Sequence, residues 1–328
     1  MPEPRFSVVV PLRDKLGFVE TCLRSLTAAA AENGSAEVIV VDHGSIDGSG
    51  DAVRVGFPSV RLVPIGPSGT LARARNAGAE RARGDVFCFV DADCVVPSDY
   101  LSRIGRTLET TDASAVGGGA VPPAGSPPLV AEWDAMRNPV VDGPCGHLDG
   151  GALSVRREAF AAVGGFDETL PAGEDSELCL RLAARGFPIV QSRSLTVTHL
   201  DNPATLREFF AKEAWHGLGM LVLPLWPPRD LATAGTLVHG FFFALAAAGA
   251  ALPDPAAARA ALAAALLAAV PASAVLRRAL ATRRVPRIFI AFALYESFFT
   301  ARLVSLAVLA WRAATRSGGA GADPGAAT

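Results

Sequence analysis

Two carboxylates separated by a single residue stand directly after an apolar run. The run Val86 to Val90 ends at Asp91 and Asp93 in the segment CFVDADCVVP. Such a run indicates a buried strand, and the carboxyl ends of parallel strands are where open α/β sheets bind their ligands. Two carboxylates there can hold Mg²⁺ and leave coordination positions for phosphate oxygens. Solvated turn acids are the alternative interpretation of the same pattern.

A second acidic pair, Glu174 and Asp175, begins a predicted helix in the segment GEDSELCLRL. Both acids lie in the first turn, where the helix dipole favours negative charge, so capping is one interpretation. Gly173 before them allows the chain to approach a ligand closely, which favours a functional carboxylate. Arg181 on the same helix could pair inward with a carboxylate. His199, after one more predicted strand, is a candidate third metal ligand.

The segments EVIVVDHGSIDGSGD and GTLARARNAG are the candidates for nucleotide binding. Asp42 ends an apolar strand and could accept a hydrogen bond from a base, while Gly44 and Gly48 permit a tight turn. An ordinary strand–turn–helix is the alternative. Arg75, on the first turns of a predicted helix, could donate a bidentate pair of hydrogen bonds to a diphosphate. Neither a dinucleotide-binding G-x-G-x-x-G nor a P-loop is present.

The elements that position these residues alternate between strand and helix over the first 110 residues. The predicted strands are Phe6–Val10 (closed by Pro11), Val38–Val41, Val60–Val63 and Val86–Val90. The predicted helices are Phe18–Ala31, Asp51–Val55 and Leu71–Arg83. Continuous apolar strands between helices predict a parallel sheet covered on both faces. The polar residues that follow each strand then gather along one edge, which is the predicted active site.

Composition narrows the class of protein. The chain has 328 residues, 50% of them hydrophobic, with a net charge of -2 and a mean hydropathy of +0.33. That net charge gives no reason to expect nucleic acid as a partner. Five cysteines without a C-x-x-C pair argue against a zinc site and a disulfide framework, and fit a reducing cytosol. The amino terminus begins directly with a predicted strand, so no signal peptide is expected.

The carboxyl-terminal third contains three long apolar segments. They run over Leu231–Leu252, Ala256–Leu276 and Ile288–Trp311, and the arginine-rich stretch RRALATRRVPR separates the last two. The first segment is nearly charge-free and long enough to cross a bilayer core of about 30 Å, whereas the second is a weaker candidate because it is mostly alanine. A basic loop on the side of the catalytic domain would satisfy the positive-inside rule, with that domain facing the cytoplasm. A hydrophobic helical subdomain is the alternative. Glu296 and Arg302 favour an interfacial or buried third segment.

Seven segments in this order resemble glycosyltransferase family 2, the GT-A-fold nucleotide-sugar transferases. They are SVVVPLRD, VIVVDHGSIDGS, ARARNAG, FVDADC, VGGFDE, GEDSELCLRL and TVTHL, spread over residues 5 to 200. Two departures lie near the expected nucleotide pocket. His43 replaces the second Asp of V-D-D-G-S, and Leu12-Arg13-Asp14 replaces the usual Thr-Tyr-Asn, so the identity of the base stays open. The Q-x-x-R-W motif of processive members is absent, which favours a single transfer.

The resemblance implies a role for individual residues. Asp175 would be the catalytic base. The residues implied to bind the donor nucleotide are Pro11, Arg13, Asp42, Arg75 and Asp91. Those implied to bind a metal, Mg²⁺ or Mn²⁺, are Asp91, Asp93 and His199. Those implied to bind the acceptor or to support the site are Gly151, Glu174 and Arg181.

The sequence therefore predicts an α/β protein with a GT-A domain over residues 1–228, hydrophobic membrane-associated helices over 229–316 and a disordered tail over 317–328. The predicted activity is inverting, metal-dependent transfer of a sugar from a nucleotide-diphosphate donor to an acceptor hydroxyl at the cell membrane. A membrane anchor suggests a lipid-linked or cell-envelope glycan acceptor. A nucleotidyltransferase-like sugar-nucleotide enzyme and a non-catalytic, membrane-anchored nucleotide-sugar-binding module are the alternatives.

Overall fold

The computed structural model describes residues 3–137, 139–219, 231–249 and 256–318. The chain divides into two compact units, which are described separately below. The first unit comprises residues 1–126 and 137–202, and the second comprises residues 127–136 and 203–328. Three features expected from the sequence lie outside the described residues. They are the domain boundary at 228/229, the end of the first apolar segment at Leu252 and most of the disordered tail.

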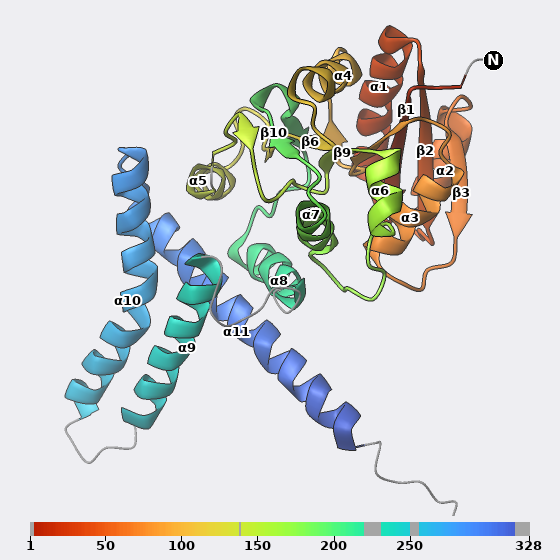
Figure 1. The fold of residues 1–328 in the computed structure, drawn as a ribbon. Coiled ribbons are helices and arrows are strands. Elements are labelled where there is room, and N and C mark those ends of the chain that lie inside the picture. The colour runs from red at the N-terminus through yellow and green to blue at the C-terminus, as the bar shows by residue number, and fades with distance from the viewer. Residues whose placement is uncertain (1–2, 138, 220–230, 250–255, 319–328) are drawn as a thin grey trace, which may run out of the picture. The chain divides into compact units, whose positions relative to one another are not determined.

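An eight-stranded sheet forms the centre of the first unit (Figure 1). In spatial order its strands are β3 (Arg61–Ile65), β2 (Ala36–His43), β1 (Phe6–Leu12), β4 (Val86–Val90), β9 (Ala152–Arg156), β6 (Ala115–Gly117), β10 (Ile189–Gln191) and β8 (Gly143–Pro144). The first four strands are parallel to one another, as their continuous apolar character predicts, and β9 runs antiparallel to both of its neighbours. The sheet is therefore mostly parallel.

Helices cover both faces of this sheet because successive side chains of each strand point to opposite sides. The helices are α1 (Leu16–Asn33), α2 (Ser49–Gly56), α3 (Leu71–Arg81), α4 (Tyr100–Thr111), α6 (Arg157–Val163) and α7 (Glu174–Ala184). Val8 and Val10 pack with α1 and α4 on one face. Val9 and Ile39 pack with α3, α6 and α7 on the other. This two-sided core fixes the strand ends that carry the polar residues.

Several predicted boundaries differ from the observed ones by one or two residues, and two of these differences have a local reason. Strand β1 continues through Pro11 to Leu12, because Pro11 pairs only with β2 and the pairing with β4 has already stopped at Val9. A proline is tolerated where its missing N–H has no ladder partner. Helix α3 ends at Arg81 rather than Arg83. The backbone N–H of Arg83 donates to Glu37 instead, which turns the chain toward β4.

A small three-stranded sheet lies beyond the end of β4. It consists of β5 (Cys94–Val95), β11 (Val197–His199) and β7 (Ala120–Val121) in the order β5-β11-β7. His199 on β11 is the register partner of Cys94 on β5. The short strand β5 follows Asp93 directly, so this pairing brings a histidine from residue 199 beside the D-x-D carboxylates.

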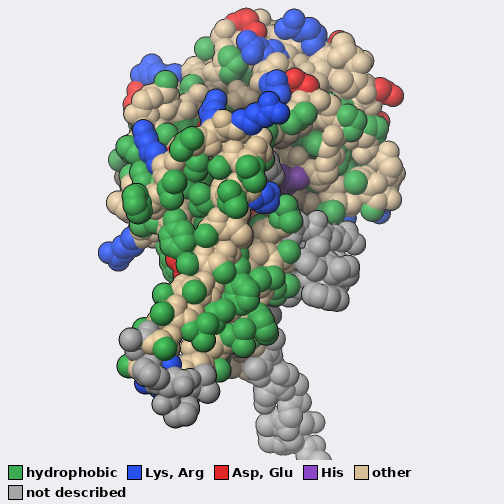
Figure 2. Space-filling view, turned by 90° about the vertical axis from the view of Figure 1, so that its left-hand side faces the viewer, with side chains coloured by type: hydrophobic (Ala, Val, Ile, Leu, Met, Phe, Trp, Pro, Cys, Tyr) green, Lys and Arg blue, Asp and Glu red, His purple; other side chains and the backbone are tan. Residues whose placement is uncertain are grey.

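The second unit is helical. Its helices are α5 (Pro128–Met136), α8 (Leu206–Gly217), α9 (Leu231–Gly249), α10 (Ala256–Thr282) and α11 (Ile288–Gly318). Three stretches are long and apolar enough to span a membrane: Leu231–Gly249, Ala258–Thr282 and Ile288–Arg312. Hydrophobic side chains gather on the surface of these helices, as Figure 2 shows in green. Such exposure is expected of helices whose solvent is lipid.

The charged residues that interrupt the third apolar segment have partners within the second unit. Arg302 donates to Glu213 on α8 at 2.8 Å. Glu296 lies 3.7 Å from His239 on α9. Beside the first pair, Ser305 donates to the carbonyl oxygen of Ala214 at 2.6 Å. The Arg302–Glu213 pair and the Ser305 hydrogen bond join α11 to α8. Pairing lowers the cost of a charged side chain on an apolar helix.

Candidate active site

The loops after β1 and β2 are bonded to each other at the edge of the first unit's sheet. Asp14, at a φ of 50°, accepts a hydrogen bond from the backbone of Ile46 at 2.8 Å. Asp47 accepts from the backbone of Leu16 at 2.8 Å and from Ser49, the first residue of α2. The N-cap residue of α2 is Gly48, and it makes no side-chain capping hydrogen bond. These hydrogen bonds join the two loops into one wall at this edge.

The two residues expected to bind the nucleotide at this wall differ in exposure. Asp42 is half-buried, and its Oδ1 accepts a hydrogen bond from the backbone of Ser45 at 2.9 Å, which shapes the turn after β2. Arg13 is exposed and points to the carbonyl oxygen of Pro67, in the loop after β3. Contact of either residue with a base therefore stays a prediction. Pro11 lies inside β1 and is buried.

Arg75 joins the two acidic motifs. Its side chain is 2% exposed and its guanidinium donates to Asp91 at 2.8 Å and to Glu174. The helix that carries Arg75 begins after Thr70, whose side chain accepts from the N–H of Arg73. Arg75 was expected to reach a diphosphate directly. Both of its terminal nitrogens are instead bonded to carboxylates, so in this structure it acts as their counter-ion.

Burial shapes the charges in this cluster. It raises the pKa of the Glu174 carboxyl, although the Arg75 guanidinium opposes the shift. It likewise raises the pKa of Asp91, against the same guanidinium. Arg75 thus counteracts the effect of burial on both carboxyls, and the pKa of Arg75 is itself raised, because their charges outweigh the effect of its own burial.

One carboxylate oxygen of Asp93 accepts a hydrogen bond and the other does not. Its Oδ2 accepts a hydrogen bond from the ammonium of Lys15 at 2.7 Å, and Lys15 also donates to Asp201 at 2.5 Å. Its Oδ1 is buried without a hydrogen-bond partner, 3.5 Å from Nε2 of His199. An unpartnered carboxylate oxygen facing an imidazole nitrogen is an arrangement that a cation would satisfy.

Cys94 completes a group of possible metal ligands with Asp93 and His199, whose ligand atoms all lie within 4.8 Å of one another. Burial and the neighbouring carboxylates of Asp91 and Asp93 raise the pKa of the Cys94 thiol. A protonated thiol is a poor ligand for a hard cation. The oxygen and nitrogen donors therefore fit Mg²⁺ or Mn²⁺ better than a thiolate-binding metal.

The second acidic motif is divided between two positions. Glu174 is 4% exposed and bonded to Arg75. Asp175 is half-buried, and its Oδ2 accepts from the backbone of Gly150 at 2.9 Å while Oδ1 accepts from Ser176 at 2.7 Å. Of the two acids, Asp175 is the more accessible to an acceptor. Its bond to Ser176 also shows that it contributes to the first turn of α7.

Gly151 lies against the D-x-D motif. A Cβ atom at this position would stand 2.8 Å from Oδ2 of Asp91 and 3.6 Å from Oδ1 of Asp149. Asp149 accepts a hydrogen bond from Gly151 and pairs with Arg137 at 3.3 Å. That guanidinium and the hydrogen bond keep the pKa of Asp149 low despite its burial. The predicted supporting role of Gly151 thus has a steric basis.

Arg181 lies outside this cluster. Its guanidinium pairs with Glu177, one turn earlier on α7, and donates to the carbonyl oxygen of Val163 at 2.5 Å. Arg181 therefore joins α7 to the end of α6, and the carboxylate with which it pairs belongs to its own helix.

Sequence reasoning missed Lys15, Cys94, Asp149 and Asp201. Of the 30 lysines and arginines, only Lys15 and Lys212 are lysines. This rarity is a signal that could have drawn attention to Lys15. Asp201 is 186 residues from Lys15, and no local pattern predicts that contact.

The fold and the site define a nucleotide-sugar transferase of the GT-A class, and the comparisons agree. Residues 7–162 match the family model described as "Glycosyl transferase family 2". The solved structure of a mannosyltransferase from Pyrobaculum calidifontis, in complex with GDP-Man and Mn²⁺, matches with a TM-score of 0.60 and 23% identity. The match covers 92% of this chain and 86% of that one. At this identity the likeness shows the fold.

Two curated relatives extend the sequence comparison. The glycosyltransferase AglE of Haloferax volcanii is 26% identical over 274 residues, covering 73% of this chain and 89% of AglE. The pre-mycofactocin glycosyltransferase of Mycobacterium tuberculosis is 28% identical over 223 residues. That match covers 64% of this chain and 46% of the relative, so the chain spans about half the length of this second protein.

Residues 7–162 belong to glycosyltransferase family 2. The chain is accordingly a glycosyltransferase that uses a nucleotide-sugar donor, rather than a nucleotidyltransferase or a non-catalytic binding module.

Proposed function

We propose that this enzyme transfers a sugar, with inversion at the anomeric carbon, from a metal-bound nucleotide-diphosphate donor to an acceptor hydroxyl at a membrane surface. One observation carries the proposal: the buried Oδ1 of Asp93 has no hydrogen-bond partner and faces Nε2 of His199. Asp93, His199 and the neighbouring Asp91 would hold Mg²⁺ or Mn²⁺. When bound, such a cation acts as a Lewis acid that neutralises the charge of the departing diphosphate.

Lys15 has a defined part in this scheme. Its ammonium compensates the charges of Asp93 and Asp201, and those two carboxylates raise its pKa although its burial alone would lower it. Lys15 donates a hydrogen bond to Oδ2 of Asp93 and none to Oδ1, so Oδ1 stays available as a ligand for the cation. Lys15 therefore limits the negative charge of the site before the donor arrives.

Asp175 is the proposed catalytic base and Glu174 is not. The acceptor hydroxyl must lose its proton as it attacks, and a carboxylate within hydrogen-bond reach contributes about 10²–10⁴-fold. Glu174 is buried and bonded to Arg75, whereas Asp175 is the accessible member of the pair. With one base and one displacement opposite the leaving group, the configuration inverts.

The apolar helices suggest where the acceptor is found. Three stretches could span a membrane, and the arginine-rich segment lies between the second and the third. By the positive-inside rule, this segment supports a cytoplasmic location for itself and for the catalytic domain. An acceptor that is lipid-linked or part of an envelope glycan would be available to an enzyme held at this surface.

A turnover assay with purified full-length protein tests the proposal. Release of nucleoside diphosphate is measured over a panel of nucleotide sugars, with a membrane-lipid extract as acceptor source. Turnover should require Mg²⁺ or Mn²⁺ and should stop on addition of EDTA. Asp93→Asn should abolish turnover, whereas Asp99→Asn, on the exposed surface beside α4, should not. Full turnover in EDTA, or by Asp93→Asn, would contradict the metal-dependent mechanism.

A further inference from the structure

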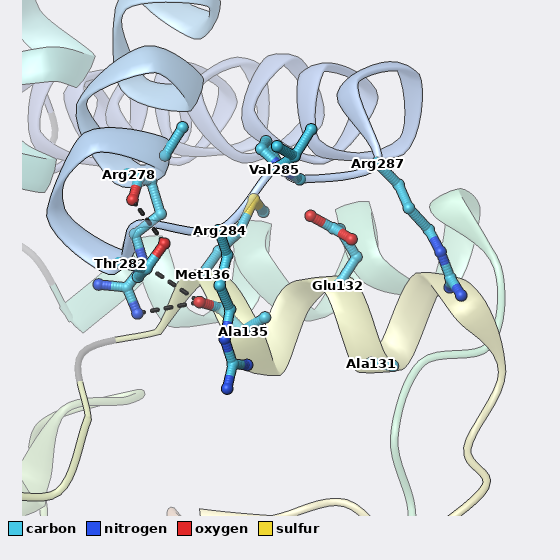
Figure 3. Close-up of a pocket in the computed structure, with 11 residues that line it drawn as sticks. Ala131, Glu132, Ala135, Met136, Arg278, Thr282, Arg284, Val285 and Arg287 are labelled. Atoms are coloured by element: carbon cyan, nitrogen blue, oxygen red, sulfur yellow. Dashed lines mark hydrogen bonds between the residues drawn. The ribbon is translucent and has the colours of Figure 1, made fainter.

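A pocket of about 280 Å³ lies within the second unit, outside the catalytic cluster (Figure 3). Helix α5, the end of α10 and the connection between α10 and α11 form its walls. Its polar lining consists of Arg278, Arg284, Arg287, Glu132 and Thr282. The apolar part includes Ala131, Ala135, Met136 and Val285. The pocket is thus rich in guanidinium groups.

The charges of the lining favour an anion. Three arginines stand against one carboxylate, that of Glu132. Arg278 donates from Nε and Nη2 to the carbonyl oxygen of Ala135, at 3.1 and 2.9 Å, which fixes its guanidinium at the wall. Arg284 and Arg287 are exposed, and their side chains form no hydrogen bond or ion pair with any residue that the structure describes. Two fork-shaped donors are therefore available to a phosphate.

The pocket lies where two candidate membrane spans meet. The span Ala258–Thr282 ends at its rim, and the span Ile288–Arg312 begins one residue after Arg287. Large apolar side chains around the connection are exposed, with Val285 and Phe289 each at 91%. Apolar side chains beside arginines at the ends of membrane helices are typical of the zone where lipid headgroups lie.

We infer that this pocket binds the phosphate of an anionic membrane lipid. Arg284 and Arg287 would donate to the phosphate oxygens, Arg278 would contribute its fixed charge, and the acyl chains would continue along the exposed apolar surface. Glu132 opposes binding, so its charge sets an upper limit on the affinity.

Binding of a fluorescent short-chain phosphatidic acid to the full chain in neutral detergent, followed by anisotropy, tests the inference. Arg284→Gln and Arg287→Gln should each weaken binding about fivefold, the effect expected of one basic residue near a headgroup. Arg283→Gln is the matched control, because Arg283 is an exposed arginine of the same connection that does not line the pocket. It should leave the affinity unchanged. Glu132→Gln should tighten binding.

Three results would overturn the inference. Equal weakening by Arg283→Gln would show diffuse attraction to the arginine-rich segment instead of a site. Displacement of the lipid by inorganic phosphate at similar concentration would identify a free-phosphate site. Equal binding of a fluorescent phosphatidylcholine would show that the apolar surface alone determines affinity. All variants should unfold at the wild-type temperature without lipid, so a folding defect is distinguishable from a loss of binding.

Discussion

Replacing Arg75 by methionine removes the guanidinium that bridges Asp91 and Glu174, and keeps most of the volume of the side chain. Glu174 is 6% exposed at its side chain and would remain as a buried charge without its partner. Breaking a buried pair from one side costs about 3–5 kcal/mol. Asp91 is 30% exposed at its side chain and therefore partly screened, so we expect about 3 kcal/mol.

The expected cost converts to a measurable shift. For a unit of this size, 1 kcal/mol corresponds to about 2–4 °C, so Arg75→Met should lower the unfolding midpoint of the first unit by about 6–12 °C. All four tryptophans belong to the second unit. Tryptophan fluorescence therefore follows the second unit, and the part of the far-UV circular dichroism transition that does not coincide with it should report the shift of the first unit.

Two further variants isolate the cause. Adding Glu174→Gln to Arg75→Met removes the stranded charge and should restore about 1–2 kcal/mol, which is the coupling expected of contacting residues. Arg81→Met, on the same helix, removes a guanidinium that is 39% exposed and should cost less than about 1 kcal/mol. A midpoint for Arg75→Met equal to that of Arg81→Met, or additive effects in the double variant, would refute the buried-bridge argument.

Three other perturbations test separate parts of the structure. Gly151→Ala places a methyl group 2.8 Å from Oδ2 of Asp91, so kcat/KM should fall by about 10²-fold while the unfolding midpoint changes little; normal kinetics would remove the steric argument. Lys15→Met should strengthen Mn²⁺ binding about fivefold in calorimetry, because a competing cation is lost, and weaker binding would contradict this. Burial raises the pKa of Glu213, but its bonds to His216 and Arg302 hold the pKa below the ordinary 4.5. The ionised Glu213 therefore stabilises the folded second unit fully above pH 4.5, and this stabilisation is lost as the pH falls through the lowered pKa. Tryptophan fluorescence should show a smaller loss of stability below pH 4.5 in Glu213→Gln than in wild type, and an unchanged pH profile would exclude this pair as the cause.

Much of the fold follows from patterns that extend over several residues. Strand β4 coincides with the predicted Val86–Val90, since an apolar run bounded by Asp85 and Asp91 leaves little choice of register. The two-residue strands β5, β7 and β8 have no such pattern, because periodicity needs more residues than they contain. They form through pairing with distant segments.

The positions of the carboxylates in the site could be predicted from the sequence, but the partners of its basic side chains could not. Asp91 and Asp93 follow a strand end, and that position is visible in the sequence. Arg75 was predicted to face a ligand because it lies near a helix start. Its real environment depends on Glu174, 99 residues away. The spacing of residues predicts on which face of a helix a side chain lies, but it does not predict which distant residues pack against that face.

The central claim is that Asp175 accepts the proton of the acceptor hydroxyl on a metal-bound donor. The most direct measurement compares kcat and donor affinity for Asp175→Asn and Glu174→Gln, with Mn²⁺ present. Asp175→Asn keeps the shape of the side chain and can still bond Gly150 through its amide oxygen, but it cannot take the proton. We predict a fall in kcat of at least about 10²-fold with donor affinity nearly unchanged, and a smaller fall for Glu174→Gln. Near-normal turnover by Asp175→Asn would contradict the account and leave the acidic pair as a structural element of α7.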